Sequence, residues 1–289
     1  MEPILNDLIG LLTLEQLDTN LFRGQSLDIG TQRVFGGQVL GQSLAAANMT
    51  VDQGAVHSMH AYFLRAGDHK APIIYEVDRQ RDGRTYSSRR VVAIQHGRPI
   101  LNLAVSFQAH EEGLSHQATM PDVPRPETLK DISEYRREFL EGLAADRIPR
   151  FLMLERPFEF RPVDAAPMVN LGSRPPKACM WFKTVSPLPD DEKLHRNMLA
   201  YVSDYSFVSV ATLPHGDAFK GTSPQLASLD HAIWFQRPFR MDQWLLYEID
   251  SPSATNGRGL VQGRIFREDG VLVALVAQEG VMRVFREPG

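Results

Sequence analysis

The stretch TSPQLASLDHAIWFQR, residues 222–237, decides how the chain folds. Its residues fall into two alternating sets at the two-residue period of a β-strand, and both sets contain apolar groups. One set is Leu226, Ser228, Asp230, Ala232 and Trp234, and the other is Ala227, Leu229, His231, Ile233 and Phe235. This pattern predicts a central strand buried on both faces. Ser228, Asp230 and His231 lie in its middle and need hydrogen-bond partners there, which we expect Asp204 and Gln278 to supply.

The segments around this stretch occur twice in the chain. Residues 73–78 (IIYEVD) match residues 245–250 (LLYEID), and residues 62–65 (YFLR) match residues 234–237 (WFQR), in both cases 172 positions apart. The hairpin expected at residues 96–97 matches the one at residues 269–270 at an offset of 173. Register that is kept over three elements predicts an internal duplication. Each copy is expected to hold one helix and an antiparallel sheet of at least four strands, and the two copies to form one continuous sheet.

The remaining segments predict how the chain is divided. Residues 4–17 have the apolar spacing of a short helix, residues 34–49 read as a helix entered through Gly36 and Gly37, and residues 194–212 form its counterpart. A polar, Pro-rich segment follows residue 110, and residues 131–147 continue it as a strongly charged amphipathic helix. We expect residues 1–110 to form the first repeat, 111–155 a connector with the charged helix, and 156–289 the second repeat, which carries the site.

Composition excludes several classes of function. The 289 residues carry a net charge of -4, which gives no reason to expect nucleic-acid binding. The single Cys179 rules out an intramolecular disulfide, and three histidines, His57, His60 and His69, lack the spacing of a metal site. No apolar run approaches the roughly 18 residues of a membrane helix, and the N-terminus has no basic signal-peptide start. We therefore expect a cytoplasmic protein without membrane insertion, metal or organic cofactor.

Polar residues that break the repeat are candidates for a site, because residues shared by both copies serve the fold. Ser228 lies opposite Val56, Gln278 lies opposite Val105, and Asp204 lies in the second long helix, opposite residues 41–42 of the first. A carboxylate among apolar neighbours is costly unless it is hydrogen-bonded. We expect the Ser228 hydroxyl and the Gln278 amide to donate hydrogen bonds to Asp204, and all three side chains to bind one water. Asp204 would activate this water as a general base toward a carbonyl carbon, and a thioester is reactive enough for direct attack.

A second motif offers a different nucleophile. Residues 41–45 (GQSLA) match the G-x-S-x-G elbow of serine hydrolases apart from the last position, where Ala45 replaces Gly. An elbow requires a buried strand directly before the serine, whereas a Gly-rich entry and a helical pattern precede Ser43. The pattern favours a structural role for Ser43.

Several segments together resemble the acyl-CoA thioesterase II family over almost the entire chain. They are FGGQVLGQ, HAYFLRAGD, SRRVVAIQHG, SFQ, YVSDY, SLDHAIWFQRPF, WLLYE and DGVLVALVAQEGVMR. The resemblance implies an α+β double hotdog fold, in which two helix-plus-antiparallel-sheet repeats form one continuous sheet. The family's catalytic Asp, Thr and Gln fall on Asp204, Ser228 and Gln278, so that Ser replaces the usual Thr. The implied function is hydrolysis of fatty acyl-CoA to free fatty acid and CoA, by a homodimer or homotetramer.

Two alternatives stay open at this point. A hotdog enoyl-CoA hydratase pairs an Asp with a His, and His231 lies close to Ser228 in the sequence. A non-catalytic acyl-CoA-binding protein would keep the fold and bind the same ligand without turnover.

Overall fold

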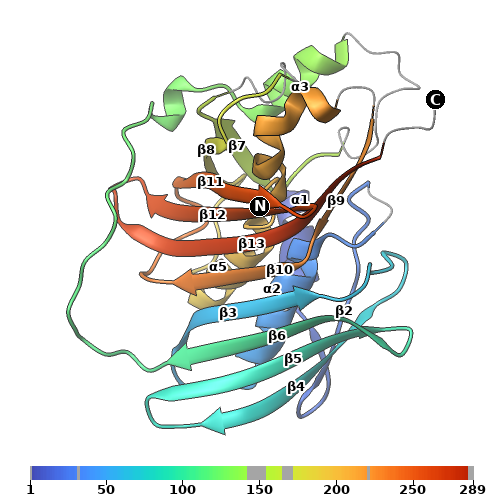
Figure 1. The fold of residues 1–289 in the computed structure, drawn as a ribbon. Coiled ribbons are helices and arrows are strands. Elements are labelled where there is room, and N and C mark those ends of the chain that lie inside the picture. Colours follow the sequence, from blue (N-terminus) through green and yellow to red (C-terminus); the bar gives the residue numbers. More distant parts are fainter. Residues whose placement is uncertain (1, 31–32, 142–153, 165–171, 220–221, 286–289) are drawn as a thin grey trace.

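A single antiparallel sheet organises the computed structural model, which describes residues 2–30, 33–141, 154–164, 172–219 and 222–285 (Figure 1). The first half contributes β1 Glu15–Asp18, β2 Leu21–Gly24, β3 Ala55–Phe63, β4 Ile73–Asp82, β5 Tyr86–Gln95 and β6 Arg98–Gln108. The second half contributes β7 Phe158–Pro162, β8 Lys177–Thr184, β9 Ser223–Ser228, β10 Asp230–Phe235, β11 Leu245–Thr255, β12 Arg258–Arg267 and β13 Leu272–Phe285. The strand order is β1-β2-β4-β5-β6-β3-β10-β13-β12-β11-β8-β7, with β9 paired to β13.

This order confirms the prediction of two similar copies in one continuous sheet. Reading outward from the central pair, β3, β6, β5 and β4 on one side correspond to β10, β13, β12 and β11 on the other. The central pair itself joins Trp234 to Ser58 and Asp230 to Tyr62 in antiparallel register. Each copy thus covers an edge of the other, which removes two exposed strand edges from the middle of the molecule.

Two helices lie antiparallel to each other on one face of this sheet (Figure 1). They are α2 Gly36–Asn48 and α5 Glu192–Val202. Gly37 near the start of α2 lies against the Tyr201 carbonyl near the end of α5, and Asn48 at the far end of α2 donates to Asn197 at 2.9 Å. The small side chains of α2 allow this close approach, because a Cβ on Gly37 would overlap the Tyr201 carbonyl oxygen.

Two helices, α1 and α5, are shorter than the sequence predicted. The first helix, α1 Pro3–Leu12, ends before Leu17, which lies exposed within β1 instead of continuing the apolar stripe. The helix expected at residues 194–212 is also too long, since α5 ends at Val202 and a 3-10 segment, η4 Val208–Phe219, follows a turn. Ser206 in that turn has a positive φ of 55°, which a regular α-helix cannot contain. Asp204 therefore lies just beyond α5 and not inside a helix.

The expected single strand at residues 222–237 is instead two strands, β9 and β10, which meet at Leu229. Ser228 pairs with Gly280 and Ala232 pairs with Ala277, so four steps on this strand face three steps on β13. The extra residue is a β-bulge, stabilised where Asp230 Oδ1 accepts from the backbone N–H of Glu279 at 2.6 Å. The bulge shifts the side-chain alternation by one residue. Ser228 and His231, which the sequence placed on opposite faces, consequently both face the helices.

The segment after β6 runs along one side of the sheet to the second half, where it includes η1 Pro126–Thr128 and α3 Ile132–Glu141 (Figure 1). The part before α3 packs on the sheet face opposite the helices, where Ala118, Met120, Val123 and Leu129 contact a small apolar cluster of Trp181, Leu246, Phe266 and Leu272. The Trp181 indole donates to the Pro124 carbonyl at 3.0 Å. Residues 142–153, including the end of the helix expected at 131–147, lie outside the described residues.

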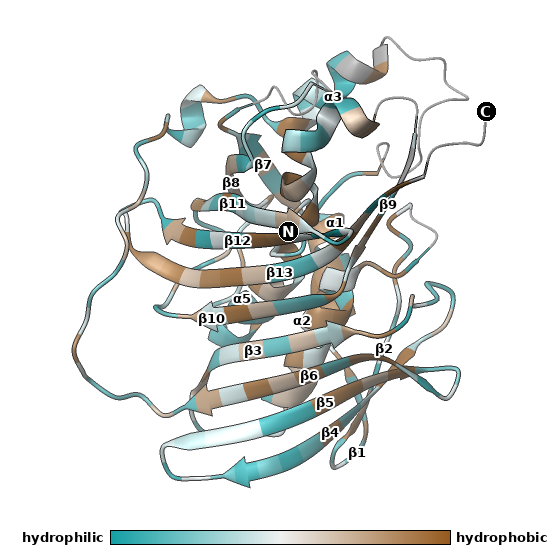
Figure 2. Cartoon of the chain, viewed as in Figure 1, coloured by the Kyte–Doolittle hydropathy of each residue, from teal (hydrophilic) through white to brown (hydrophobic). Residues whose placement is uncertain are grey.

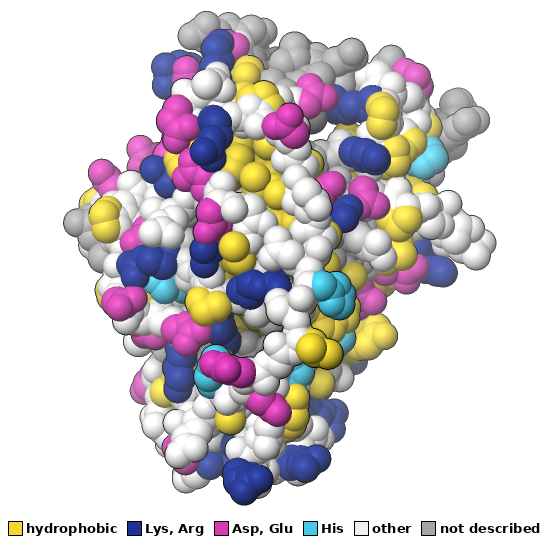
Figure 3. All heavy atoms as spheres, turned by 90° about the vertical axis from the view of Figure 1, so that its left-hand side faces the viewer, with side chains coloured by type: hydrophobic (Ala, Val, Ile, Leu, Met, Phe, Trp, Pro, Cys, Tyr) yellow, Lys and Arg dark blue, Asp and Glu magenta, His cyan; other side chains and the backbone are white. Residues whose placement is uncertain are grey.

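Side-chain polarity follows the two faces of the sheet. Hydrophobic and hydrophilic residues alternate along the strands in Figure 2, and the helix-facing set, such as Tyr75, Val91, Leu103 and Ile265, is buried. On the molecular face shown in Figure 3, Lys and Arg lie interspersed with Asp and Glu and form no large patch of one sign. Among the described residues, no helix is long and apolar enough to span a membrane.

Candidate active site

Asp204 lies where the end of one long helix meets the start of the other. The turn after α5 brings its partly buried carboxylate against Gly36 and Gly37, the first two residues of α2. The backbone N–H of Gly37 donates to this carboxylate. Unpaired N–H groups and the helix dipole make a helix N-terminus favourable for a negative charge. The second repeat thus supplies the carboxylate, and the first repeat supplies the helix end that holds it.

The structure brings all three residues predicted from the sequence together. Gln278 Nε2 donates to Asp204 Oδ1 at 3.1 Å and to Ser228 Oγ at 2.5 Å. The Ser228 hydroxyl lies 3.4 Å from Asp204 Oδ1 and points its donor toward it. Both side-chain bonds reach Oδ1, whereas Oδ2 lies beside Gly36 and accepts no side-chain hydrogen bond from the described residues.

Burial controls the charge of Asp204. Loss of solvation raises the pKa of this carboxyl to about 6, while hydrogen bonds from Gln278, Gly37 and Ser228 act in the opposite direction. The usual value for an aspartate is about 3.9. A carboxylate with a pKa of about 6 is ionised at neutral pH and is a stronger base than an ordinary aspartate, which suits general base catalysis.

His231 and Ser203 also belong to this cluster, although neither was assigned to the site from the sequence. His231 Nδ1 lies 2.6 Å from Gln278 Oε1, and His231 Nε2 lies 2.9 Å from Ser203 Oγ. The signal for His231 was present in the repeat, because this histidine corresponds to Met59 at the same offset that relates Ser228 to Val56. Ser203 gave no such signal, since its role depends on where α5 ends.

Among its described residues, the first repeat has no second copy of this cluster. The facing pair His231 and Gln278 corresponds to the apolar pair Met59 and Val105, which are also direct neighbours across two strands. The second residue after α2 is Thr50, which is the structural counterpart of Asp204. This corrects the sequence comparison, which placed Asp204 opposite residues 41–42. Thr50 Oγ1 accepts from Nε of the buried Arg89 guanidinium at 2.9 Å, so this position contacts a cation and carries no carboxylate.

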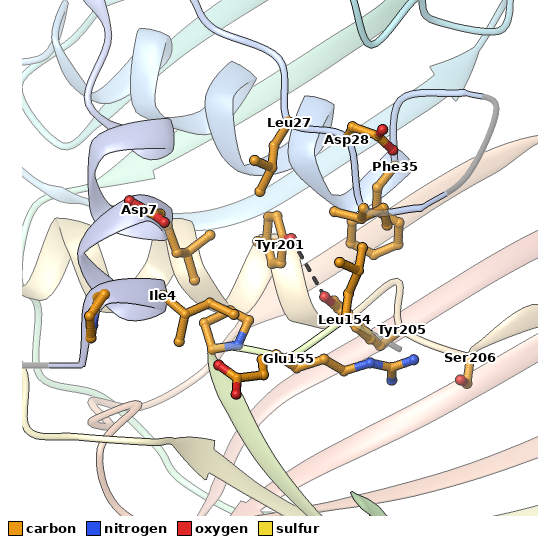
Figure 4. A pocket seen from close by; sticks show the side chains of 15 residues that line it. Ile4, Asp7, Leu27, Asp28, Phe35, Leu154, Glu155, Tyr201, Tyr205 and Ser206 are labelled. Atoms are coloured by element: carbon orange, nitrogen blue, oxygen red, sulfur yellow. Dashed lines mark hydrogen bonds between the residues drawn. The ribbon is translucent and has the colours of Figure 1, made fainter. Parts of the chain in front are cut away.

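Two cavities approach the cluster from different sides. The larger, about 700 Å³, lies between α1, the loop before α2 and the end of α5, and its lining is mainly apolar (Figure 4). Ile4, Leu8, Leu27, Phe35, Tyr201 and Tyr205 are among the residues around it. The smaller, about 310 Å³, is lined by Gly36 and Ser228 and also by Arg33 and Arg65. Asp204 is adjacent to lining residues of both cavities, because its chain neighbour Tyr205 lines the first and its contacts Gly36 and Ser228 line the second.

Other reactive side chains are poorly placed for chemistry. Ser43 is fully buried in the middle of α2, and among the described residues its hydroxyl has no partner that could act as a base. Burial raises the pKa of the Cys179 thiol to about 12, so this thiol stays protonated. Within the described ranges, no group of three or more His, Cys, Asp or Glu side chains could hold a metal ion.

The contact between Gly36 and Asp204 yields a prediction. In Gly36→Ala the new Cβ would lie 2.6 Å from Asp204 Oδ2, so the carboxylate must move. A displacement of this size at a reacting group can cost on the order of 10²-fold in turnover, so we expect kcat to fall while the protein stays folded. Gly37→Ala is the contrasting variant, because its Cβ would lie 2.0 Å from the backbone carbonyl oxygen of Tyr201, so it should also lower the melting temperature. Equal kcat in Gly36→Ala and the wild type would show that Oδ2 is not used.

A double-copy hotdog sheet with a desolvated carboxylate near a cavity fits the class of hotdog thioesterases. Comparison with protein families agrees. Residues 153–281 match the model described as acyl-CoA thioesterase, and residues 25–108 match the acyl-CoA thioesterase N-terminal domain. Human acyl-coenzyme A thioesterase 8 is 44% identical over 95% of this chain and 88% of its own length. Acyl-CoA thioesterase 2 of Haemophilus influenzae is 43% identical over 98% of this chain and 99% of its own.

Solved structures give the same assignment. An acyl-CoA thioesterase II, TesB2, from Mycobacterium marinum is 40% identical, with a TM-score of 0.79 over 96% of this chain and 99% of that one. The chain belongs to the acyl-CoA thioesterase family and is a thioester hydrolase with a double hotdog fold.

Proposed function

We propose that this chain hydrolyses fatty acyl-CoA to free fatty acid and CoA by direct attack of a water held by Asp204, Ser228 and Gln278. The observation that carries the proposal is the position of the Asp204 carboxylate, bonded through Oδ1 and adjacent to lining residues of two cavities. Asp204 Oδ2 takes a proton from the water as its oxygen attacks the carbonyl carbon. The carbon–sulfur bond then breaks, and Asp204 returns the proton to the leaving thiolate sulfur.

The cavities suggest how the substrate lies. The larger cavity has the size and the apolar lining typical of ligand pockets, so we assign the acyl chain to it. The smaller cavity reaches Ser228 and Gly36 and carries Arg33 and Arg65, so we assign the CoA side of the thioester to it. The thioester would then span the position of Asp204. The division of the chain at residues 110 and 155 stays a proposal, which the two family matches at 25–108 and 153–281 support.

The hydratase alternative is less well supported by the geometry of His231. A hydratase needs an imidazole nitrogen that is free to exchange a proton with substrate, whereas both nitrogens of His231 contact protein atoms and the side chain is fully buried. Purified protein with a saturated medium-chain acyl-CoA and a thiol reagent separates the possibilities. Thiol release supports hydrolysis, whereas binding without thiol release would support a non-catalytic acyl-CoA-binding protein.

Ser228 provides a paired prediction. Ser228→Thr keeps the hydroxyl and should retain most of the activity, whereas Ser228→Ala removes a hydrogen bond to a charged group. Such a bond is worth roughly 1.5 to 3 kcal/mol, so kcat should fall about ten- to a hundredfold. Steady-state kinetics of both variants measure this. Unchanged kcat in Ser228→Ala would show that Ser228 only packs as a small side chain.

The raised pKa of Asp204 predicts the pH dependence. The base must be ionised, so kcat/KM should be constant at neutral pH and fall as pH drops through about 6. An aspartate with the usual value would keep its activity down to a pH near 4. A pH profile of thiol release on one acyl-CoA measures the difference, and an inflection near 4 would contradict the desolvated site.

A further inference from the structure

His231 is a fully buried titratable side chain that the proposed mechanism does not use. Its ring lies on β10 directly opposite Gln278 on β13, with the edge of Phe207 against it at 5.9 Å between ring centroids. Burial lowers the pKa of His231 to about 4, so the imidazole is neutral at pH 7. A neutral imidazole has one donor nitrogen and one acceptor nitrogen, and its neighbours determine which is which.

The hydrogen bonds assign every proton in this cluster. Gln278 Nε2 faces the Asp204 carboxylate, an acceptor, so the other amide atom, Oε1, faces His231. An amide oxygen only accepts, so His231 carries its proton on Nδ1 and donates to Oε1 at 2.6 Å. Nε2 is then an acceptor, so the single proton of the Ser203 hydroxyl is assigned to the 2.9 Å contact with Nε2 and not to the Ala200 carbonyl oxygen, which lies 3.1 Å from the same hydroxyl. All the bonds in this chain run in one direction, from Ser203 through His231 and Gln278 to Asp204.

The series of hydrogen bonds begins and ends at adjacent residues, because Ser203 directly precedes Asp204 in the sequence. The position of Ser203 is fixed as well, since the hydroxyl of buried Tyr247 donates to the Ser203 carbonyl at 3.1 Å. The same turn that places the Asp204 carboxylate therefore also places the hydroxyl that contacts His231 Nε2. Chains of hydrogen bonds that share one direction strengthen each other in a poorly solvated interior.

We propose that His231, oriented by Ser203, is a positioning residue that holds the Gln278 amide with its two N–H groups toward Asp204 and Ser228. This inference rests on the proposed function of the Asp204 cluster. If His231 Nδ1 did not donate to Oε1, only the Asp204 carboxylate among the described contacts would determine which side Oε1 and Nε2 of Gln278 occupy. Rotation of the Gln278 amide by half a turn would bring Oε1 against the Asp204 carboxylate and break the hydrogen bonds that Nε2 donates to Asp204 and Ser228. The three residues would then no longer hold the water in place.

The first repeat supports the substitution that tests this inference. Met59 occupies the position of His231 there, fully buried at the same step of the corresponding strand, so methionine fits a strand of this fold. We expect His231→Met to lower kcat by on the order of 10- to 100-fold with little change in KM, because only the orientation of the water is affected. Ile233→Met is the matched control, two residues along the same buried face, and should keep near-normal kcat.

Rescue and coupling separate positioning from a merely structural role. His231→Asn can place an amide N–H near the position of Nδ1 and should recover most of the activity. In a Gln278→Ala background, His231→Met should cause no further loss, because its effect passes through Gln278. If His231→Met does not fold, Ser203→Ala takes its place in the same cycle, with a smaller expected loss of kcat.

The outcomes are distinct. A loss of kcat that persists undiminished in the Gln278→Ala background, or near-normal kcat in His231→Met, would overturn the positioning role while leaving hydrolysis intact. A wild-type protein that releases no thiol from acyl-CoA would instead overturn the proposed function. Loss in His231→Met, recovery in His231→Asn and no added loss in the double variant support the inference.

Discussion

Asp204→Asn should lower kcat on acyl-CoA by on the order of 10² to 10⁴ while the protein remains folded. Asparagine keeps the shape of the side chain and an oxygen that can accept from Gln278 and Ser228, but it cannot take a proton from water. The effect therefore isolates the base from the hydrogen-bond network. Steady-state thiol release at neutral pH, with circular dichroism as a folding control, measures it.

The stability of this variant provides an independent check. Because the native state raises the pKa of Asp204 to about 6, it binds this proton more tightly than the unfolded chain does. The contribution of Asp204 to stability is therefore largest below the unfolded value near 4 and is lost as pH rises toward 6. Asp204→Asn removes the buried charge and should melt at or above the wild-type temperature at pH 7. Asp191→Asn is a matched control, since asparagine also caps a helix well and Asp191 caps the far end of α5.

Gln278→Ala should lower kcat by on the order of 10²-fold, because it removes the donor to both Asp204 and Ser228. Combined with Asp204→Asn it should cost much less than the product of the two single effects, since residues that hold one water act as a unit. A double-mutant cycle in kcat measures the coupling. Two effects that simply multiply would show that Gln278 serves the fold independently of Asp204.

The global fold followed from the sequence because duplication is recorded in local patterns. The offset of 172 residues between Ile73 and Leu245 can be found by comparing segments only as long as one strand. The strand order confirms the duplication that this offset predicts. The ends of the helices and strands were harder to predict from the sequence. The end of α5 depends on the positive φ of Ser206, and the bulge at Leu229 depends on pairing with β13, neither of which a periodic pattern contains.

The sequence also pointed to three residues that the structure brings together, whereas it did not predict their geometry, and their catalytic role stays a prediction. Asp204, Ser228 and Gln278 each break the repeat, and the structure brings all three together as predicted. Asp204 was expected within a helix, however, and its placement at the N-terminus of α2 needs the antiparallel packing of two helices from different repeats. The shared face of Ser228 and His231 likewise needs the bulge. The contacts that orient this cluster are tertiary, and sequence spacing alone does not specify them.

Product analysis in ¹⁸O-labelled water tests the central claim most directly. With a saturated medium-chain acyl-CoA, the wild-type protein should release CoA and fatty acid in equal amounts, with one ¹⁸O atom in each carboxylate. Asp204→Asn, folded and still binding the substrate, should form both products at least about 100-fold more slowly. Release of CoA without labelled acid, or a folded Asp204→Asn with near-normal turnover, would contradict water attack assisted by Asp204.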